Sequence, residues 1–229
     1  QETERQRRDF IANVSHELKT PMTTIAGYTD GILDGTIPPE KERKYLQIIS
    51  DESRRLSRLV RRMLDLSRLN ALAENNITAQ EQFDLVEVVS QVIISLENKI
   101  TDRNLDMDVQ MPEDKLMVWG DPDSVTQVCY NLIDNAAKFA ASGTSITLRI
   151  TKKDGKAYTS ISNLGATIPQ DELPLLFDRF HKADYSRSMD RDGVGLGLYI
   201  VKTILGNLKE NITVTSEDGL TTFTFTLTL

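Results

Sequence analysis

Apolar residues recur at three- and four-residue steps along the first third of the chain. In the first run they are Ile11, Val14, Leu18, Ile25 and Ile32. This spacing is typical of the seam of a coiled-coil-like bundle and predicts a long helix over residues 3–34. A second run predicts a helix over residues 40–73, with its stripe at Leu46, Ile49, Leu56, Leu59, Val60, Met63 and Leu66. Glycine and prolines within residues 35–39 predict a tight turn between the two helices.

Two amphipathic helices joined by a short turn form an antiparallel hairpin. One hairpin offers no partner for apolar stripes of this length, so we expect a homodimer through residues 1–73. In that dimer, two hairpins would close a four-helix bundle. The alternative is that the stripes pack on the second half of the same chain. Residues 74–82 are polar and predict a linker.

The remainder of the chain mixes two periods. Residues 86–100, 122–140 and 195–208 have helical spacing. Apolar and polar residues alternate at 105–110, 145–150, 158–162, 212–215 and 222–229, which predicts strands. Helices and strands mixed in this way favour an α/β sandwich in which helices cover one face of a single sheet. The predicted fold class is therefore α+β, with a helical hairpin at residues 1–73 and a sandwich domain at residues 83–229.

Composition narrows the possible functions of the chain. The first 70 residues carry 13 lysines and arginines against 11 aspartates and glutamates, whereas the remainder carries 14 against 23. An acidic second part argues against nucleic acid as the main partner. Two histidines and the single cysteine, Cys129, leave little for a zinc site and exclude an intramolecular disulfide. No apolar run approaches the roughly 20 residues of a membrane-spanning helix.

His16 is the first candidate for chemistry. It lies two residues from both Val14 and Leu18, roughly 200° around a helix from either, so its side chain should face away from the apolar stripe. An exposed imidazole beside the carboxylate of Glu17 is a candidate nucleophile or proton carrier. Pro21 removes one helical hydrogen bond, which predicts a bend just after His16.

The helix at 122–140 carries a second candidate site. Asn131, Asn135 and Lys138 are spaced at i, i+4 and i+7, which puts two amides and an ammonium on a single face. Such a face suits a polyphosphate with a hydrated Mg²⁺, which prefers oxygen ligands. A solvent-exposed polar face is the alternative, although asparagine in mid-helix is unfavourable. Further along, glycines at 193–197 precede a helix start and would let a backbone approach phosphate oxygens.

Together these motifs resemble the cytoplasmic core of the sensor histidine kinases of two-component systems. The resemblance covers nearly the whole chain. The stretch Ser15–Pro21 is similar to the family's H box, and Asn131–Phe139 is similar to its N box. Leu176–Phe180 resembles the F box, and Gly193–Gly197 resembles the second glycine box. The H box is highly specific, and the four motifs occur in the family's order.

The resemblance implies a dimeric helical hairpin followed by a sandwich of the GHKL type, the ATP-binding fold shared with gyrase, Hsp90 and MutL. It implies that His16 takes the γ-phosphoryl group of ATP and that Glu17 accepts the imidazole proton. Thr20 resembles the residue that orients water for dephosphorylation of the partner, a response regulator receiver domain. Asn135 would ligate Mg²⁺. The implied ATP-binding residues are Asn131, Asn135, Lys138, Phe139, Asn163, Gly165, Lys182, Gly193, Gly195, Gly197 and Leu198.

Three positions depart from the family pattern. The first glycine box normally reads Asp-x-Gly-x-Gly, and its aspartate accepts the adenine amino group. Here Asn163 offers a neutral and weaker acceptor. Thr167 stands in place of the second glycine, and a threonine can adopt fewer backbone conformations than a glycine. Lys182 occupies the position of an arginine in many relatives. The positive charge is kept, but the planar guanidinium with its paired hydrogen-bond donors is lost. We expect activity with weaker ATP binding.

The expected function is ATP-dependent phosphorylation of His16, followed by transfer to an aspartate of a response regulator. Three alternatives remain: mainly a phosphatase of the phosphorylated regulator that uses Thr20, a non-enzymatic dimeric scaffold that binds nucleotide, and an isolated ATPase of the gyrase type. The intact His16, Glu17 and Asn135 argue against the scaffold, and the H box argues against the isolated ATPase. By analogy with the family, the chain would be the cytoplasmic portion of a protein anchored in the bacterial plasma membrane by upstream segments.

Overall fold

The computed structural model of the chain describes residues 2–74, 80–178, 181 and 195–229. The chain divides into two compact units, Gln1–Arg68 and Leu69–Leu229. The first unit is helical, and the second contains all the strands of the described ranges. No helix in these ranges is both long and apolar enough to cross a membrane.

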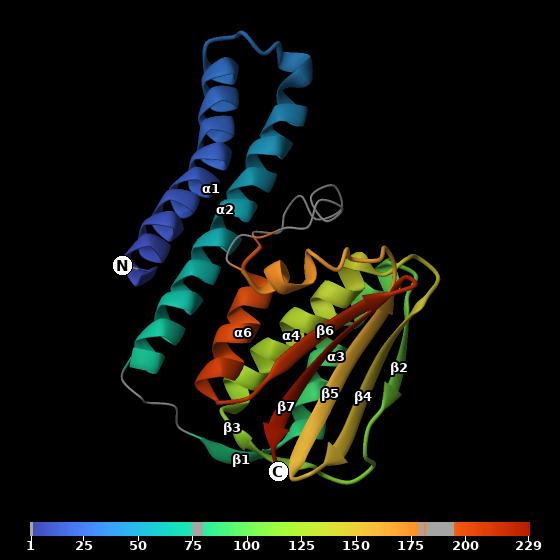
Figure 1. Cartoon of the computed structure of the whole chain (residues 1–229). Helices are drawn as coiled ribbons and strands as arrows, with labels where there is room; N and C mark the ends of the chain where they lie inside the picture. The colour runs from blue at the N-terminus through green and yellow to red at the C-terminus, as the bar shows by residue number, and fades with distance from the viewer. Residues whose placement is uncertain (1, 75–79, 179–180, 182–194) are drawn as a thin grey trace. The chain divides into compact units, whose positions relative to one another are not determined.

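The first unit is a helical hairpin. Helices α1 (Glu2–Leu33) and α2 (Pro39–Glu74) run antiparallel (Figure 1). Backbone hydrogen bonds close the turn, from Ile37 N to Gly31 O at 2.8 Å and from Asp34 N to Asp30 O at 2.9 Å. Gly35 has a φ of 77°, which glycine adopts readily because it has no Cβ. The predicted hairpin is confirmed, and each helix ends within one residue of its expected position.

Both helices of the hairpin keep large apolar side chains in contact with solvent. The rings of Tyr28 and Tyr45 pack near the turn, with centroids 4.9 Å apart. Elsewhere the exposed apolar residues are Ile11, Met22, Leu33, Leu46, Val60 and Leu64. Several of them belong to the predicted apolar stripes, so the stripes extend over more surface than this hairpin buries.

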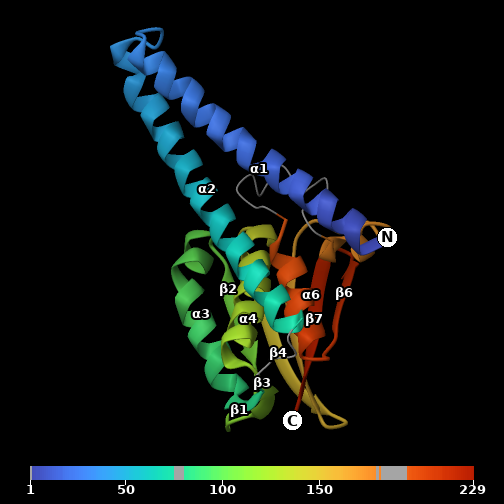
Figure 2. The ribbon, with the colours of Figure 1, turned by 90° about the vertical axis from the view of Figure 1, so that its left-hand side faces the viewer.

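The second unit is built on a five-stranded sheet with the strand order β2-β4-β5-β7-β6. The strands are β2 (Asp106–Gln110), β4 (Ser145–Lys153), β5 (Lys156–Leu164), β6 (Ile212–Glu217) and β7 (Leu220–Thr228). Strand β2 is parallel to β4, and the other neighbours are antiparallel. Figure 1 and Figure 2 show one face of the sheet covered by α3 (Leu85–Asp102), α4 (Pro122–Phe139) and α6 (Gly197–Asn207). The predicted α/β sandwich is therefore confirmed.

The two faces of the sheet differ in chemistry. Every second residue of β5 and β7 points to the helices and is buried. Ile161 of β5 and Phe225 of β7 are examples. The intervening positions carry hydroxyl groups that pair across the strands, with Ser160 and Thr224 2.8 Å apart and Ser162 and Thr222 also 2.8 Å apart. This alternation of period two puts the apolar core between the sheet and its helices.

Two sharp turns set the ends of the long strands. The β4–β5 turn has Asp154 at φ 49° and Gly155 at φ 74°, and the β6–β7 turn has Asp218 at φ 48° and Gly219 at φ 82°. Positive φ at both central residues is the property of type I′ turns, which match the twist of a hairpin. Strands β4 and β5 consequently run almost to their turn and are longer than predicted.

A second, two-stranded sheet was not predicted. Strands β1 (Glu81–Asp84) and β3 (Met117–Gly120) pair antiparallel, with Phe83 opposite Val118. The predicted linker at 74–82 therefore overlaps two elements, because α2 ends at Glu74 and β1 already begins at Glu81. Residues 75–79 lie outside the described residues. The 3-10 helix η1 (Leu173–Phe177) was likewise not predicted.

Candidate functional site

The first group of candidate residues lies on α1. His16 is exposed, as its place opposite the apolar stripe predicted. Glu17 is half-buried, and its carboxylate lies 3.7 Å from the Arg55 guanidinium of α2. The Thr20 hydroxyl donates to the backbone oxygen of His16 at 3.3 Å, so this side chain lies one turn from the imidazole. Helix α1 continues through Pro21 as one element.

The second group lies on α4, whose apolar side is fully buried. Leu132 and Ile133 have no exposed surface, which fixes the helix against the sheet. Asn131 and Asn135 are half-buried on the opposite, polar side. The side-chain Nδ2 of Asn131 is buried, and among the described residues it has no hydrogen-bond partner. A buried amide donor without a partner is unfavourable, so this atom is suited to a ligand that would satisfy it.

Asp134 lies between these two asparagines and is 6% exposed. One carboxylate oxygen pairs with Lys99 of α3, and the other lies 2.9 Å from the ammonium of Lys138. Burial alone would raise the pKa of Asp134. The charges of Lys138 and Lys99, with their hydrogen bonds, outweigh burial and hold that pKa below its ordinary value. Asp134 is therefore an ionised group within the polar face of α4.

The end of α4 is held against the end of β5. A Cβ on Gly165 would lie 2.3 Å from the backbone oxygen of Phe139, a distance that no side chain allows. The backbone N–H of Ala141 also donates to the oxygen of Leu164 at 2.7 Å. Glycine at position 165 is thus required by the close approach of two backbones, and this approach brings Phe139 and Gly165 together.

Asn163 and Thr167 flank this contact. Asn163 is 6% exposed, and a Cβ on Gly165 would lie 3.6 Å from its side-chain Nδ2. The hydroxyl of Thr167 accepts a hydrogen bond from Gly219 N at 2.8 Å, and Gly165 N donates to Gly219 O at 2.8 Å. The loop after β5 is therefore tied to the β6–β7 turn. Sequence reasoning missed this role of Thr167, because its partner is 52 residues away.

The start of α6 completes the described part of the site. A Cβ on Gly197 would lie 3.7 Å from the side-chain oxygen of Asn131, so the first residue of α6 lies beside the polar face of α4. Gly195 has a φ of 69°, and Leu198 is half-buried in the first turn of α6. Lys182 and Gly193, two further predicted nucleotide contacts, lie outside the described residues.

The structure thus brings together predicted ATP-binding residues from three elements. They are Asn131, Asn135, Lys138 and Phe139 of α4, Asn163 and Gly165 at the end of β5, and Gly197 and Leu198 of α6. His16, Glu17 and Thr20 form a separate group in the first unit. The first unit thus offers an exposed imidazole adjacent in sequence to a carboxylate, and the second unit offers amides, an ammonium and a helix start.

Comparison with known proteins assigns both units. Residues 6–72 match the family model of the His Kinase A (phospho-acceptor) domain. Residues 120–229 match the model of the histidine kinase-, DNA gyrase B-, and HSP90-like ATPases. The chain belongs to the sensor histidine kinases. Its second unit accordingly has the GHKL-type fold that the sequence predicted.

Relatives of this family support the same assignment. The sensor protein SrrB of Staphylococcus aureus (strain NCTC 8325 / PS 47) is 36% identical over 215 residues, which are 93% of this chain and 36% of SrrB. The chain therefore spans about a third of the length of the curated relatives it matches. The solved histidine kinase AdeS of Acinetobacter baumannii has a TM-score of 0.72 and 26% identity, and the match covers 93% of this chain and 97% of AdeS.

A second solved structure contains both a histidine kinase and another protein. It is the histidine kinase ThkA in complex with the response regulator protein TrrA, with a TM-score of 0.76 and 25% identity. The match covers 99% of this chain and 65% of that kinase chain. The sensor histidine kinase fold therefore extends over both units of this chain.

Proposed function

We propose that this chain is the catalytic core of a protein-histidine kinase. It would phosphorylate His16 with ATP and pass the phosphoryl group to an aspartate of a response regulator receiver domain. The observation that carries this proposal is the polar face of α4 beside the start of α6, where the buried Nδ2 of Asn131 finds no partner within the described part of the chain. The exposed His16 and the two matched family models support the same function.

The residues of the second unit fit a nucleotide with its metal. Asn135 would give an amide oxygen to Mg²⁺, which keeps several waters and takes its other ligands from phosphates. Asn131 and Lys138 would contact the phosphates, and the glycines up to Gly197 would let the backbone approach them. Phe139, Asn163, Gly165 and Leu198 would line the adenine side. When bound, ATP would supply the phosphoryl group and Mg²⁺ would neutralise its charge. All of these residue roles, and those of Lys182, Gly193 and Gly195, stay predictions.

The chemistry at the acceptor follows from His16 and its neighbours. Glu17 would accept the proton from one imidazole nitrogen, so the lone pair of the other could form the N–P bond as the bond to ADP breaks. The Glu17 carboxylate, which follows the imidazole by one position in the sequence, lies 3.7 Å from the guanidinium of Arg55. His16 needs to stay accessible because the nucleotide domain and the regulator would have to reach it in turn.

We further infer that the chain is a homodimer through residues 1–73. The exposed apolar positions on both helices, among them Ile11, Leu46 and Val60, are suited to a second hairpin that would complete a four-helix bundle. The ThkA structure, in which a kinase of this fold is bound to a response regulator, supports a receiver domain as the second partner. Plasma-membrane anchoring of the whole protein through upstream segments stays a prediction.

A second candidate function is dephosphorylation of the regulator. Thr20 is exposed and lies one turn from His16, on the surface where the regulator would bind. Its hydroxyl could orient the water that attacks the aspartyl phosphate. The neutral Asn163 would weaken adenine binding and so favour this activity over the kinase reaction. Loss of regulator dephosphorylation in Thr20→Ala, with His16 phosphorylation retained, would support this function.

The proposal is tested with γ-labelled ATP and Mg²⁺. We expect label on the protein that survives base but not acid, as a phosphohistidine does, and no label on His16→Gln. His181 is the other histidine, and in His181→Gln the label should remain on the peptide that contains His16. Absence of acid-labile label, or label that persists in His16→Gln, would refute the kinase. A monomeric mass at micromolar concentration would refute the dimer.

A further inference from the structure

Lys99 of α3 is a charged residue with no part in the function proposed above. It lies in the last turn of α3, and its ammonium contacts one oxygen of the buried Asp134. The other oxygen of Asp134 is 2.9 Å from Lys138. One carboxylate is thus shared by two lysines from two helices, and the side chain of Lys99 is 43% exposed against 23% for Lys138.

The two contacts are not equivalent for nucleotide binding. Lys138 is four residues from Asp134 on the same helix and belongs to the face that carries Asn131 and Asn135. Lys99 approaches the carboxylate from a different helix, on the separate oxygen Oδ1. A single ammonium neutralises a single carboxylate, so Asp134 stays paired when either lysine is engaged elsewhere.

A buried carboxylate strongly resists loss of its last cation, because an uncompensated charge in a poorly solvated site is unfavourable. If Lys138 were the sole partner of Asp134, its transfer to a phosphate oxygen would leave that carboxylate unpaired. Lys99 removes this penalty, since it continues to neutralise Asp134 after Lys138 has turned away. The pair of lysines therefore makes Lys138 available to an anion.

We propose that Lys99 is a positioning residue for nucleotide binding. It keeps the Asp134 carboxylate paired through Oδ1, and so allows the ammonium of Lys138 to exchange Oδ2 of that carboxylate for a phosphate of the nucleotide. This inference rests on the proposed ATP-dependent function and assigns a role to a residue outside the polar face of α4. Lys99 itself does not contact the phosphates.

The test compares Lys99→Met with Lys99→Arg, and uses the exposed Lys152→Met as a matched control. The dissociation constant of ATP with Mg²⁺ is measured by titration, together with the ATP concentration for half-maximal His16 phosphorylation and the maximal rate. In Lys99→Met we expect both concentrations to rise by about fivefold or more. The maximal rate should stay within about twofold, since the coupling acts on binding rather than on transfer. Lys99→Arg and Lys152→Met should resemble the original chain.

A second substitution separates positioning from a direct contact. Adding Asp134→Asn to Lys99→Met removes the carboxylate that would retain Lys138, so affinity for ATP should recover toward that of the original chain. Thermal unfolding of each variant checks that it is folded. If the folded double variant stays as weak as Lys99→Met, then Lys99 acts on the phosphates directly or through the fold, and the inference is overturned.

The outcomes for the two proposals are distinguishable. If the original chain binds no ATP, the proposed kinase function fails. If the original chain binds ATP and Lys99→Met binds it equally well, the role of Lys99 fails while the kinase function stands. A fall in the maximal rate of Lys99→Met at unchanged ATP affinity would also contradict positioning through Lys138.

Discussion

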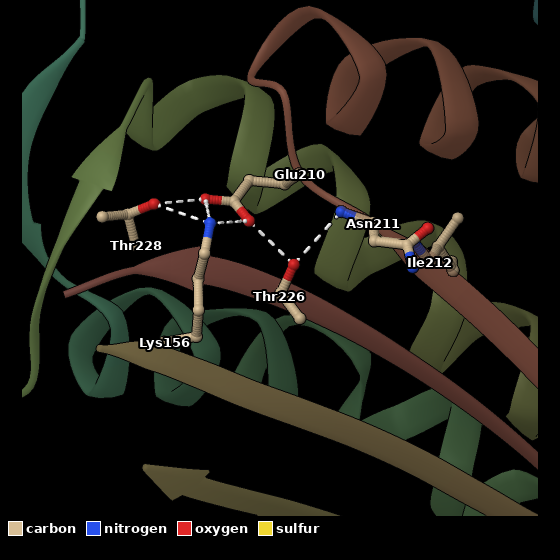
Figure 3. Close-up of polar contacts among 6 residues, drawn as sticks. All are labelled: Lys156, Glu210, Asn211, Ile212, Thr226 and Thr228. Atoms are coloured by element: carbon tan, nitrogen blue, oxygen red, sulfur yellow. Dashed lines mark hydrogen bonds and ion pairs between the residues drawn. The ribbon is translucent and has the colours of Figure 1, made fainter. Parts of the chain in front are cut away.

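A cluster of polar side chains around Glu210 joins the end of α6 to two strands of the sheet (Figure 3). The Glu210 side chain is 4% exposed, and both of its oxygens lie 2.8 Å from the ammonium of Lys156 in β5. It also accepts hydrogen bonds from Thr226 at 2.7 Å and Thr228 at 2.6 Å, both in β7. Because the carboxylate ties three segments together, we expect Glu210→Gln to destabilise the second unit.

The magnitude follows from the contacts that glutamine can keep. An amide retains one acceptor oxygen, whereas its NH₂ group cannot accept from Lys156 or from a threonine hydroxyl. The lost oxygen accepts one hydrogen bond from Lys156 and one from a threonine, both charge-assisted, which together correspond to roughly 3–6 kcal/mol. The Lys156 side chain is 35% exposed, so water replaces part of that loss. We expect a decrease of about 2 kcal/mol in the free energy of unfolding, which lowers Tm by about 4–8 °C in a unit of this size.

The effect of Glu210→Gln should depend on pH. Burial alone would raise the pKa of Glu210, but hydrogen bonds from Lys156, Thr228 and Thr226 outweigh it and hold that pKa below its ordinary value of 4.5. A carboxyl whose pKa is lower in the folded state stabilises the fold above its unfolded pKa and loses this contribution as the pH falls through the folded pKa. The difference between the two proteins should therefore be full at pH 7 and shrink below pH 4.5.

Urea unfolding followed by circular dichroism measures this difference at several pH values. The exposed Glu97→Gln of α3 is the control and should change stability by less than about 0.5 kcal/mol. Lys156→Met should also destabilise, and the double variant should lose less than the sum of the two single losses. If Glu210→Gln unfolds within about 0.5 kcal/mol of the original chain at pH 7, the Glu210 cluster does not hold the strands.

Three other predictions concern single side chains of the second unit. Asn163→Asp should tighten ATP binding by about fivefold, because a charged acceptor binds an amino group more strongly, and a nucleotide titration measures this. Thr167→Val should remove the hydrogen bond to Gly219 N, destabilise the unit by about 1 kcal/mol and speed hydrogen exchange at that amide. Burial raises the pKa of the Cys129 thiol to about 12, so alkylation at pH 8, followed by mass spectrometry, should require unfolding.

Each of these predictions has a result that contradicts it. Weaker ATP binding by Asn163→Asp would mean that the amide donates to the base rather than accepting from it. Unchanged exchange at the Gly219 amide in Thr167→Val would mean that the hydroxyl does not hold this turn. Alkylation of Cys129 in native buffer, at a rate independent of urea, would mean that the helix α4 opens readily.

The hairpin and its ends were predictable because the signal is local. A helical stripe repeats over many residues of α1 and α2, and the glycine and prolines of 35–39 stop it. Strands β1 and β3 gave no comparable signal, since each has four residues and their pairing joins positions more than 30 residues apart. The Asp-Gly pairs at 154–155 and 218–219 did carry a local turn signal, and they would have fixed the strand ends.

The candidate site also has one part that the sequence predicts and one part that it does not. The polar face of α4 follows from spacing alone, because Asn131, Asn135 and Lys138 belong to one helix. The contact of Lys99 with Asp134 joins residues 35 positions apart in different helices. No pattern within either helix indicates that pairing. Periodicity predicts which side chains share a face, whereas the charges that surround that face depend on how the helices pack.

The first glycine box illustrates why one departure from a family pattern is tolerated and another would not be. A Cβ on Gly165 would collide with the backbone oxygen of Phe139 at 2.3 Å, so any side chain there would separate β5 from α4. At position 167 the side chain is exposed, and its hydroxyl binds Gly219 N. Of the two positions where the family pattern has glycine, only position 165 is sterically restricted by a backbone contact in this chain. Thr167 therefore replaces a glycine without distorting the loop and adds a hydrogen bond that glycine cannot make.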